Sequence, residues 1–294
     1  MKYWIGFIGL LIGLLSPALG ILFIIPAVWH QMIHKPQVIY RFFSVFFLTS
    51  IALYLLKITE LIQILNLLIG TGLTCFLLFY LLNQRYLLNV VLMIVLFTNT
   101  LYIAIQRILF STIITAQYNE ALDKSIDIIS RNYAEHSEQY QLFMEMVELS
   151  RDFYLKYSPG FWVCFILICL LFGFYFFSRK NVYRYQLIRY RTHIYVIYSL
   201  VIALLLALVS KWRIISLNYL IAMIPLFLLQ GIAVLFVKLG KWLFYSKLII
   251  LMGIIILLIN PYLLILISVV GLMDNWLDFR KLIKPEDLNE NNYD

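Results

Sequence analysis

The sequence contains few acidic residues, and it keeps almost all of them out of its apolar stretches. Only 15 of the 294 residues are Asp or Glu, against 23 Lys and Arg. Eight acidic residues lie between Glu120 and Asp152, six lie from Asp274 to the end, and Glu60 stands alone. A carboxylate at the centre of a bilayer costs roughly 3 kcal/mol. This distribution therefore predicts that the remaining, largely apolar segments lie in a membrane.

Charged residues and cysteines are also scarce, and each shortage excludes a class of protein. Charged side chains make up 13% of the chain and hydrophobic ones 63%, whereas roughly 25% charged residues are usual in a soluble domain. Cys75, Cys164 and Cys169 all fall inside apolar runs, which excludes a disulfide-stapled extracellular module and predicts free thiols. The basic residues are scattered between apolar runs, so we expect a lipid bilayer and no nucleic acid as partner.

Motifs for catalysis are absent from the sequence. It has no glycine-rich phosphate loop, no paired-cysteine motif, no Gly-x-Ser-x-Gly elbow and no His-Glu-x-x-His helix. We therefore expect no enzymatic activity, no catalytic residues, no metal site and no cofactor. Without a nucleotide-binding motif, any transport would depend on a separate energising protein partner.

Apolar runs of spanning length are what the sequence has in abundance. A transmembrane helix needs about 20 apolar residues, and runs that meet or approach this length lie at 41–58, 62–83, 86–110, 159–178, 193–210, 218–240, 242–259 and 261–277. Residues 3–33 form one more apolar stretch, which is either one tilted helix or two short helices divided at Ser16 and Pro17. The sequence thus predicts an all-α polytopic transmembrane helix bundle of about nine or ten spans.

Basic residues predict which ends of the spans face the cytoplasm. Residues 179–193 contain five Lys or Arg and no acid, which places this segment inside and residues 116–158 outside by the positive-inside rule. Alternation of the spans then puts the C-terminus in the cytoplasm. The N-terminus is cytoplasmic as well if residues 3–33 cross twice, which is the arrangement that we favour.

The long polar segment divides the chain into four parts. These are an N-terminal transmembrane bundle (1–115), an extracytoplasmic helical insertion (116–158), a C-terminal transmembrane bundle (159–282) and a cytoplasmic tail (283–294). Apolar residues recur at helical spacing within the insertion, at Leu122, Ile126 and Ile129 and then at Leu142, Met146, Leu149 and Phe153. Two amphipathic helices joined near Asn132 would form a cap on the bundle, an element on the outer leaflet or a plain connector. A lid and a partner-docking surface are the functional interpretations.

Uncharged polar side chains inside the predicted spans are the candidates for ligand binding. Such groups must bond either to another helix or to a solute in a cavity. Gln230 lies near the middle of its span beside Gly231, where the missing side chain lets a helix or a ligand approach closely. The candidate solute pocket consists of Asn66, Asn99, Asn218, Gln230 and Gly231. The alternative is that these amides bond across helices and the glycines are packing notches.

The most distinctive local pattern is the closing segment 271–281, with the sequence GLMDNWLDFRK. On a continued helix, Asp274 and Asp278 would share one face, and Trp276 could lie at the level of the lipid headgroups. The segment then either anchors the end of the last span or acts as a polar latch against the basic residues 179–191. A third interpretation is a docking site for a cytoplasmic partner. The candidate residues are Asp274, Trp276, Asp278 and Arg280.

The Gly-Leu-x-Asp-x-Trp-x-Asp-Phe-Arg ending resembles that of the YybS-like family of predicted bacterial membrane proteins, a domain of unknown function. Two further passages agree with it: Tyr157-Ser158-Pro159, and Asn218 followed by the segment Gln230-Gly231-Ile232-Ala233-Val234. The resemblance covers roughly residues 116–282 and implies a multi-pass protein of the bacterial cytoplasmic (inner) membrane. The family is distantly similar to the S components of energy-coupling-factor vitamin transporters and to the cell-shape protein MreD.

These two likenesses imply different functions. An S-component-like protein would bind or transport a small solute and depend on an energising partner. An MreD-like protein would be a non-catalytic scaffold that organises partner membrane proteins. The long insertion departs from the compact S component, whereas the buried amides favour solute binding, to which we give a slight preference.

Overall fold

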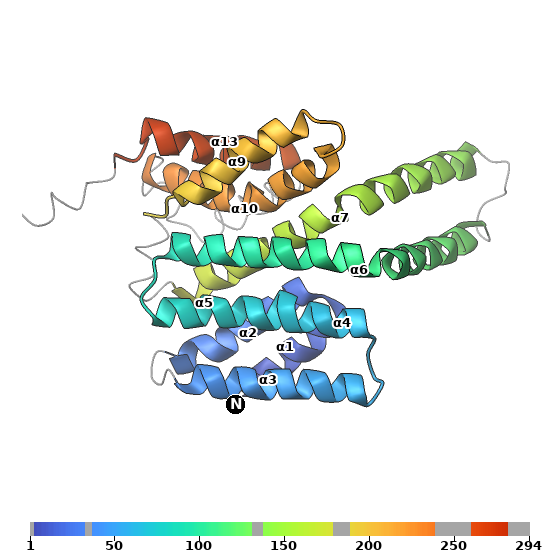
Figure 1. Ribbon diagram of the computed structural model, residues 1–294, viewed down its shortest axis with the longest axis horizontal. Coiled ribbons are helices and arrows are strands. Elements are labelled where there is room, and N and C mark those ends of the chain that lie inside the picture. Colours follow the sequence, from blue (N-terminus) through green and yellow to red (C-terminus); the bar gives the residue numbers. More distant parts are fainter. Residues whose placement is uncertain (1–2, 33–36, 131–137, 179–188, 239–259, 282–294) are drawn as a thin grey trace, which may run out of the picture.

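The computed structural model describes residues 3–32, 37–130, 138–178, 189–238 and 260–281. The predicted span 242–259, the tail 283–294 and most of the basic segment 179–193 lie outside these residues. Throughout the described ranges the regular structure is helical (Figure 1), as predicted. The helices are α1 (Tyr3–Leu15), α2 (Pro17–Met32), α3 (Gln37–Leu55), α4 (Leu61–Leu65), η1 (Asn66–Leu73), α5 (Thr74–Asn83), α6 (Leu88–Ser130), α7 (Glu138–Ser178), α9 (Ile194–Ala207), α10 (Arg213–Lys238) and α13 (Pro261–Leu277).

Several of these helices are suited to a membrane. Within the described part of the chain, five are long and apolar enough to cross one: Gln37–Leu55, Leu61–Asn83, Leu88–Ile128, Tyr140–Tyr175 and Arg213–Lys238. Shorter apolar helices lie at Gly6–Leu15, Pro17–Val28, Ile194–Ala207 and Tyr262–Leu277. The protein is therefore an all-α, polytopic membrane helix bundle.

The first apolar stretch is divided into two helices. α1 ends at Leu15 and α2 begins at Pro17, and the two pack against each other as an antiparallel hairpin (Figure 1). Thirteen residues of α1 rise only about 20 Å, whereas the hydrocarbon core of a bilayer is about 30 Å thick. The division at Ser16 agrees with the favoured arrangement, and the number of membrane crossings stays a prediction.

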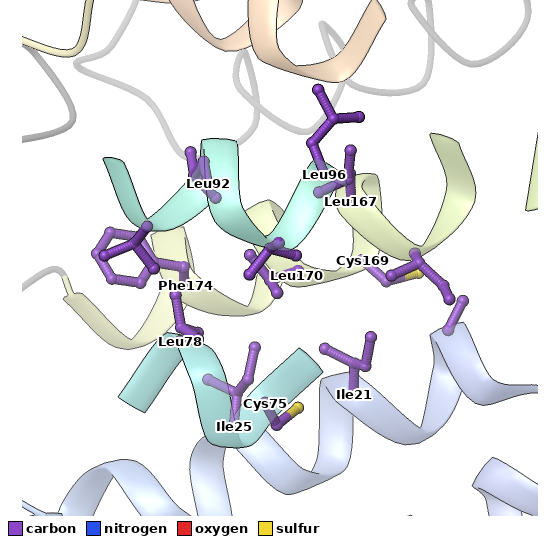
Figure 2. Packing of buried hydrophobic residues seen from close by; sticks show 14 of the residues in the cluster. Ile21, Ile25, Cys75, Leu78, Leu92, Leu96, Leu167, Cys169, Leu170 and Phe174 are labelled. Carbon is purple, nitrogen blue, oxygen red and sulfur yellow. The ribbon is translucent and has the colours of Figure 1, made fainter. Parts of the chain in front are cut away.

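The main hydrophobic core lies where α2, α5, α6 and α7 meet. Figure 2 shows side chains from all four helices in this core: Ile21, Ile25, Cys75, Leu78, Leu92, Leu96, Leu167, Cys169, Leu170 and Phe174. The three cysteines are buried and free, as the sequence predicted. The later helices α9, α10 and α13 pack together beside this core, and α10 joins them to it through α7.

Two helices are much longer than a membrane is thick. α6 has 43 residues and α7 has 41, so each spans about 60 to 65 Å at 1.5 Å per residue. Their connected ends project beyond the other helices as an antiparallel pair (Figure 1). We call residues 111–130 and 138–158 the arm. The polar insertion is therefore a continuation of two apolar helices, with a non-helical residue at Phe110 in α6 and Pro159 in α7 where the arm begins.

Candidate functional site

A buried ion pair lies at the end of α13. The Asp274 carboxylate has no exposed surface, and its Oδ2 accepts hydrogen bonds from Nε and Nη2 of Arg280 at 3.0 and 2.7 Å. Residues six apart on a straight helix point about 120° away from each other and lie more than one turn apart, so the pair requires the chain to turn. It does so at Asp278, whose φ of 41° and ψ of 54° end the helix in the left-handed conformation.

α13 ends at Leu277, the last residue of the predicted span 261–277, and does not continue through Lys281. Asp278 lies beyond the last helical residue, Leu277, and its backbone conformation returns Arg280 toward the preceding turn. The turn places the Arg280 guanidinium against the buried Asp274 carboxylate. This contact stabilises the turn, because a buried charge without a partner is strongly unfavourable.

Gln230 of α10 connects this ion pair to the start of α9. Its Nε2 donates to Asp274 Oδ2 at 3.0 Å and to Asn275 Oδ1 at 3.2 Å. Its Oε1 accepts from the backbone N–H and the hydroxyl of Thr192 at 2.9 and 2.7 Å. A carboxamide offers two donor hydrogens and two acceptor lone pairs, so protein groups use all four. In this arrangement Gln230 has no hydrogen-bonding capacity left for a solute.

The basic segment reaches the closing segment through Arg191. Its Nη2 donates to the backbone oxygen of Asp274 at 3.1 Å and to Asp278 Oδ1 at 3.3 Å. We use the name polar latch for Arg191, Thr192, Gln230, Asp274, Asp278 and Arg280. Trp276 takes no part in it, because its side chain is 64% exposed; the headgroup position that we expect for this residue stays a prediction.

Two glycines bring α10 and α13 close enough for the latch to form. A Cβ at Gly231 would lie 2.0 Å from the backbone oxygen of Ile267, and one at Gly271 would lie 2.0 Å from that of Phe227. Such distances are impossible for any other residue without moving a helix. The role that the geometry gives to Gly231 is thus close helix packing, which sets Gln230 against Asp274.

The other predicted amides have partners of their own and lie elsewhere. Asn99 of α6 donates to the Thr74 hydroxyl at 2.8 Å and is fully buried. Asn66 at the start of η1 accepts from the Tyr102 hydroxyl at 2.7 Å and from Gln106 Nε2 at 2.9 Å. Each of these contacts joins the helix of residues 61–83 to α6, far along the chain from the latch. No hydrogen bond within the described ranges brings the four candidate amides together.

Asn218 has the most specific arrangement, at the break that Pro159 makes in α7. Its Oδ1 accepts from the backbone N–H of Gly160 at 2.7 Å, and its Nδ2 donates to the backbone oxygen of Lys156 at 2.7 Å. In an uninterrupted helix those two groups would bond to each other. Asn218 thus inserts its amide into the hydrogen-bond ladder of α7, and a Cβ on Gly160 would lie 2.4 Å from the Asn218 backbone oxygen. Asn218 belongs to one of the passages that carried the resemblance, and its partners Lys156 and Gly160 flank another, Tyr157-Ser158-Pro159.

The arm is a real hairpin with its own internal contacts. The Tyr118 and Tyr154 rings stack at 4.1 Å, and Arg151 of α7 donates to Asn119 Oδ1 of α6 at 2.8 Å from Nη2. Val147 of α7 is buried. On the surface Lys124 pairs with Glu120 at 2.7 Å, and this hydrogen bond lowers the pKa of the Glu120 carboxyl.

A second apolar face of the arm points away from these contacts. The four residues that the sequence singled out on α7 are mostly exposed, with fractions of 59, 67, 75 and 52% for Leu142, Met146, Leu149 and Phe153. We call them the docking stripe. Their spacing of four, three and four residues is that of a coiled-coil seam. The sequence found these residues but could not show that Arg151 and Tyr154, on another side of the same helix, would contact α6.

A family model for a group described as predicted membrane protein (DUF2232) matches residues 4–275. The chain belongs to the DUF2232 family of predicted membrane proteins. No curated protein and no solved structure matches it. The match includes the N-terminal third, which the local patterns had not reached, and it stops before Arg280.

Membership of DUF2232 fixes the membrane class and no activity. The YybS-like, S-component and MreD likenesses, the bacterial inner membrane and the orientation of the termini therefore stay predictions. Among the latch residues, sequence reasoning missed Thr192. A threonine next to a basic segment gives no signal, and its role appears only when α9 is packed against α10.

Proposed function

We propose that this DUF2232 protein is a non-catalytic membrane scaffold that binds a partner protein through its arm. The observation that carries the proposal is the docking stripe, four large apolar side chains held at coiled-coil spacing on a helix that stands clear of the bundle. Exposed apolar patches of this kind are typical of interaction sites. The absence of any catalytic motif in the sequence supports a role without enzymatic activity.

The polar groups of the bundle support the scaffold over the solute binder to which the sequence gave a slight preference. A solute pocket at Gln230 would need unused donors or acceptors, and protein groups occupy all four. Asn99 and Asn218 likewise bond to protein groups at their own helix contacts. The amides thus act as cross-links between helices, which is the alternative that the sequence left open.

Solute binding is the second candidate function, and one pocket favours it. A pocket of about 580 Å³ lies around the turn between α3 and α4, with Lys57, Glu60 and Gln63 among its lining residues. The Glu60 carboxylate accepts a hydrogen bond from Gln117 at the base of the arm at 2.5 Å. An ammonium and a carboxylate at one opening suit a small zwitterion.

Photo-crosslinking in the native membrane tests the scaffold. A photoreactive residue at Leu149 should give a discrete protein adduct, and the same residue at Ser125, which is exposed on the other helix of the arm, should not. The adduct should survive Gln230→Ala. Equal labelling at both positions would contradict the proposal. A stoichiometric solute in native mass spectra that is lost on Glu60→Gln would support the second candidate instead.

A further inference from the structure

The docking stripe has a complete heptad register. Because Leu142 to Met146 is a step of four and Met146 to Leu149 a step of three, Leu142 and Leu149 occupy d positions. Met146 and Phe153 then occupy a positions. The stripe therefore has the residue spacing of one side of a two-helix coiled coil.

The charges beside the seam lie on one edge only. Counting from the a positions, the g positions are Glu138, Glu145 and Asp152, three acids spaced seven residues apart. The e positions, Phe143 and Ser150, carry no charge. In a coiled coil the e and g residues of the two helices face each other and choose the partner through ion pairs. An acidic edge therefore selects a helix with basic residues at the facing positions.

From this geometry we infer that the docking stripe binds an amphipathic helix whose apolar seam is bordered by Lys or Arg. The inference rests on the proposed scaffold function and names the chemistry of its partner. The arm as a whole agrees, because its described residues comprise seven acids and three bases. The negative electrostatic potential of these residues attracts a basic partner and speeds its association.

Two other occupants fit the charges less well. A second copy in parallel would set its acidic g edge against an uncharged e edge, and an antiparallel copy would set acid against acid, so neither forms ion pairs. A membrane surface is also disfavoured, because anionic headgroups repel Glu145 and Asp152. The stripe belongs to the part of α7 that projects beyond the neighbouring helices (Figure 1).

The test uses the full-length protein in neutral detergent and two labelled synthetic helices of about four heptads with the same leucine seam. One helix carries Lys at its e and g positions and the other carries Glu. We expect the lysine helix to bind at least about tenfold more tightly by fluorescence anisotropy, with the difference shrinking as salt is added. Met146→Ser with Leu149→Ser should abolish the binding of both.

A matched pair of variants separates the acidic edge from general attraction between opposite charges. Glu145→Gln with Asp152→Asn should weaken binding of the lysine helix about fivefold. Asp123→Asn with Asp127→Asn removes the same charge from α6 and should change it less than about twofold.

Any of the following results would overturn the inference: equal affinity for both helices, equal loss in the two charge variants, or cross-linking of Leu149 to a second copy. Binding to anionic vesicles that is lost with the stripe would also overturn it. The proposed scaffold function has a separate readout, which is the adduct that Leu149 forms with a different protein. If that adduct is retained while one of these results is found, the scaffold function is still supported and only the basic character of the partner helix is rejected.

Discussion

The polar latch and the arm invert the usual arrangement of a membrane protein in opposite ways. The latch buries an Asp–Arg pair and a glutamine among apolar helices, and the arm exposes a row of apolar side chains on a polar hairpin. In the latch each of these three residues bonds to protein, although Asp274 Oδ1 and Arg191 Nε have no partner in the described part of the chain. In the docking stripe each of the four apolar residues is more than half exposed among the described residues.

From this difference we infer that the polar latch stabilises the fold, whereas the docking stripe is available to a partner. Buried polar groups that bond to one another fix how helices pack, and they leave nothing for a ligand. Exposed apolar groups at regular spacing contribute little to the isolated chain, but they offer a second helix a surface to bury. The variants below test that division, from the largest expected loss of stability to the smallest.

The largest effect is expected from Arg280→Met. It leaves the fully buried Asp274 carboxylate without its cation, which typically costs about 3 to 5 kcal/mol of unfolding free energy. Thermal unfolding in detergent can be followed with a thiol-reactive dye, because Cys75, Cys164 and Cys169 are all buried. The melting temperature should fall by many degrees.

The control for this variant removes both charges. Asp274→Leu with Arg280→Met should recover most of the loss, to within about 1 to 2 kcal/mol of the natural protein, because apolar residues often replace a buried ion pair well. If the double variant unfolds as readily as the single one, the loss of stability in Arg280→Met does not come from an unpaired buried charge.

A smaller loss is expected from Gly231→Ala. The added methyl group meets the backbone oxygen of Ile267, so α10 and α13 must separate, at a cost of about 1 to 3 kcal/mol. The matched control is Gly173→Ala, whose nearest neighbour is the flexible end of Ile25. That side chain can rotate, so the control should lose clearly less stability in the same thermal assay. Equal losses would mean that the close crossing of α10 and α13 does not matter.

The sequence predicted the class of the fold well and the sites only in part. Apolar runs identified α3, α9, α10, α13 and the helix of residues 61–83 within a few residues, because hydrophobic length decides what can span a bilayer. They missed the parts of α6 and α7 that form the arm. The same runs could not show that the chain stays helical from the kink at Phe110 to Ser130, since a helix that leaves the membrane loses its apolar pattern without losing its hydrogen bonds.

The sequence assigned the candidate residues to two separate groups, the amides for ligand binding and the closing segment. Only the structure showed that one member of the first group bonds to the second. Gln230 was selected as a possible ligand residue and Asp274 with Arg280 as a latch, although they form one hydrogen-bonded unit. The contact depends on Gly231 and Gly271 meeting across two helices, and no spacing along one chain encodes such a meeting. The left-handed turn at Asp278 was equally hidden, because neither glycine nor proline marks it.

Asn218→Leu tests the side-chain amide that bonds to the two unpaired backbone groups at the break in α7. It removes the acceptor for Gly160 N–H and the donor for the Lys156 oxygen, at an expected cost of about 1 to 2 kcal/mol. Hydrogen exchange at the Gly160 amide should accelerate in parallel. Asn89→Leu is the control, because the amide oxygen of Asn89 accepts a hydrogen bond from the N–H of the next residue, Val90. Unchanged exchange at Gly160 would contradict the assigned role of Asn218.

The smallest effect is expected from the docking stripe, and there a small effect is the informative result. Leu149→Ser should change the unfolding free energy by less than about 0.5 kcal/mol, because 75% of the side chain is already exposed. Val147→Ser, two residues away and buried, should cost about 1 to 3 kcal/mol. If the two variants lose equal stability, another part of this chain covers the stripe and the surface is not open to a partner. If only Val147→Ser melts early while Leu149→Ser weakens binding of the lysine helix, one face of α7 stabilises the fold and the other binds the partner.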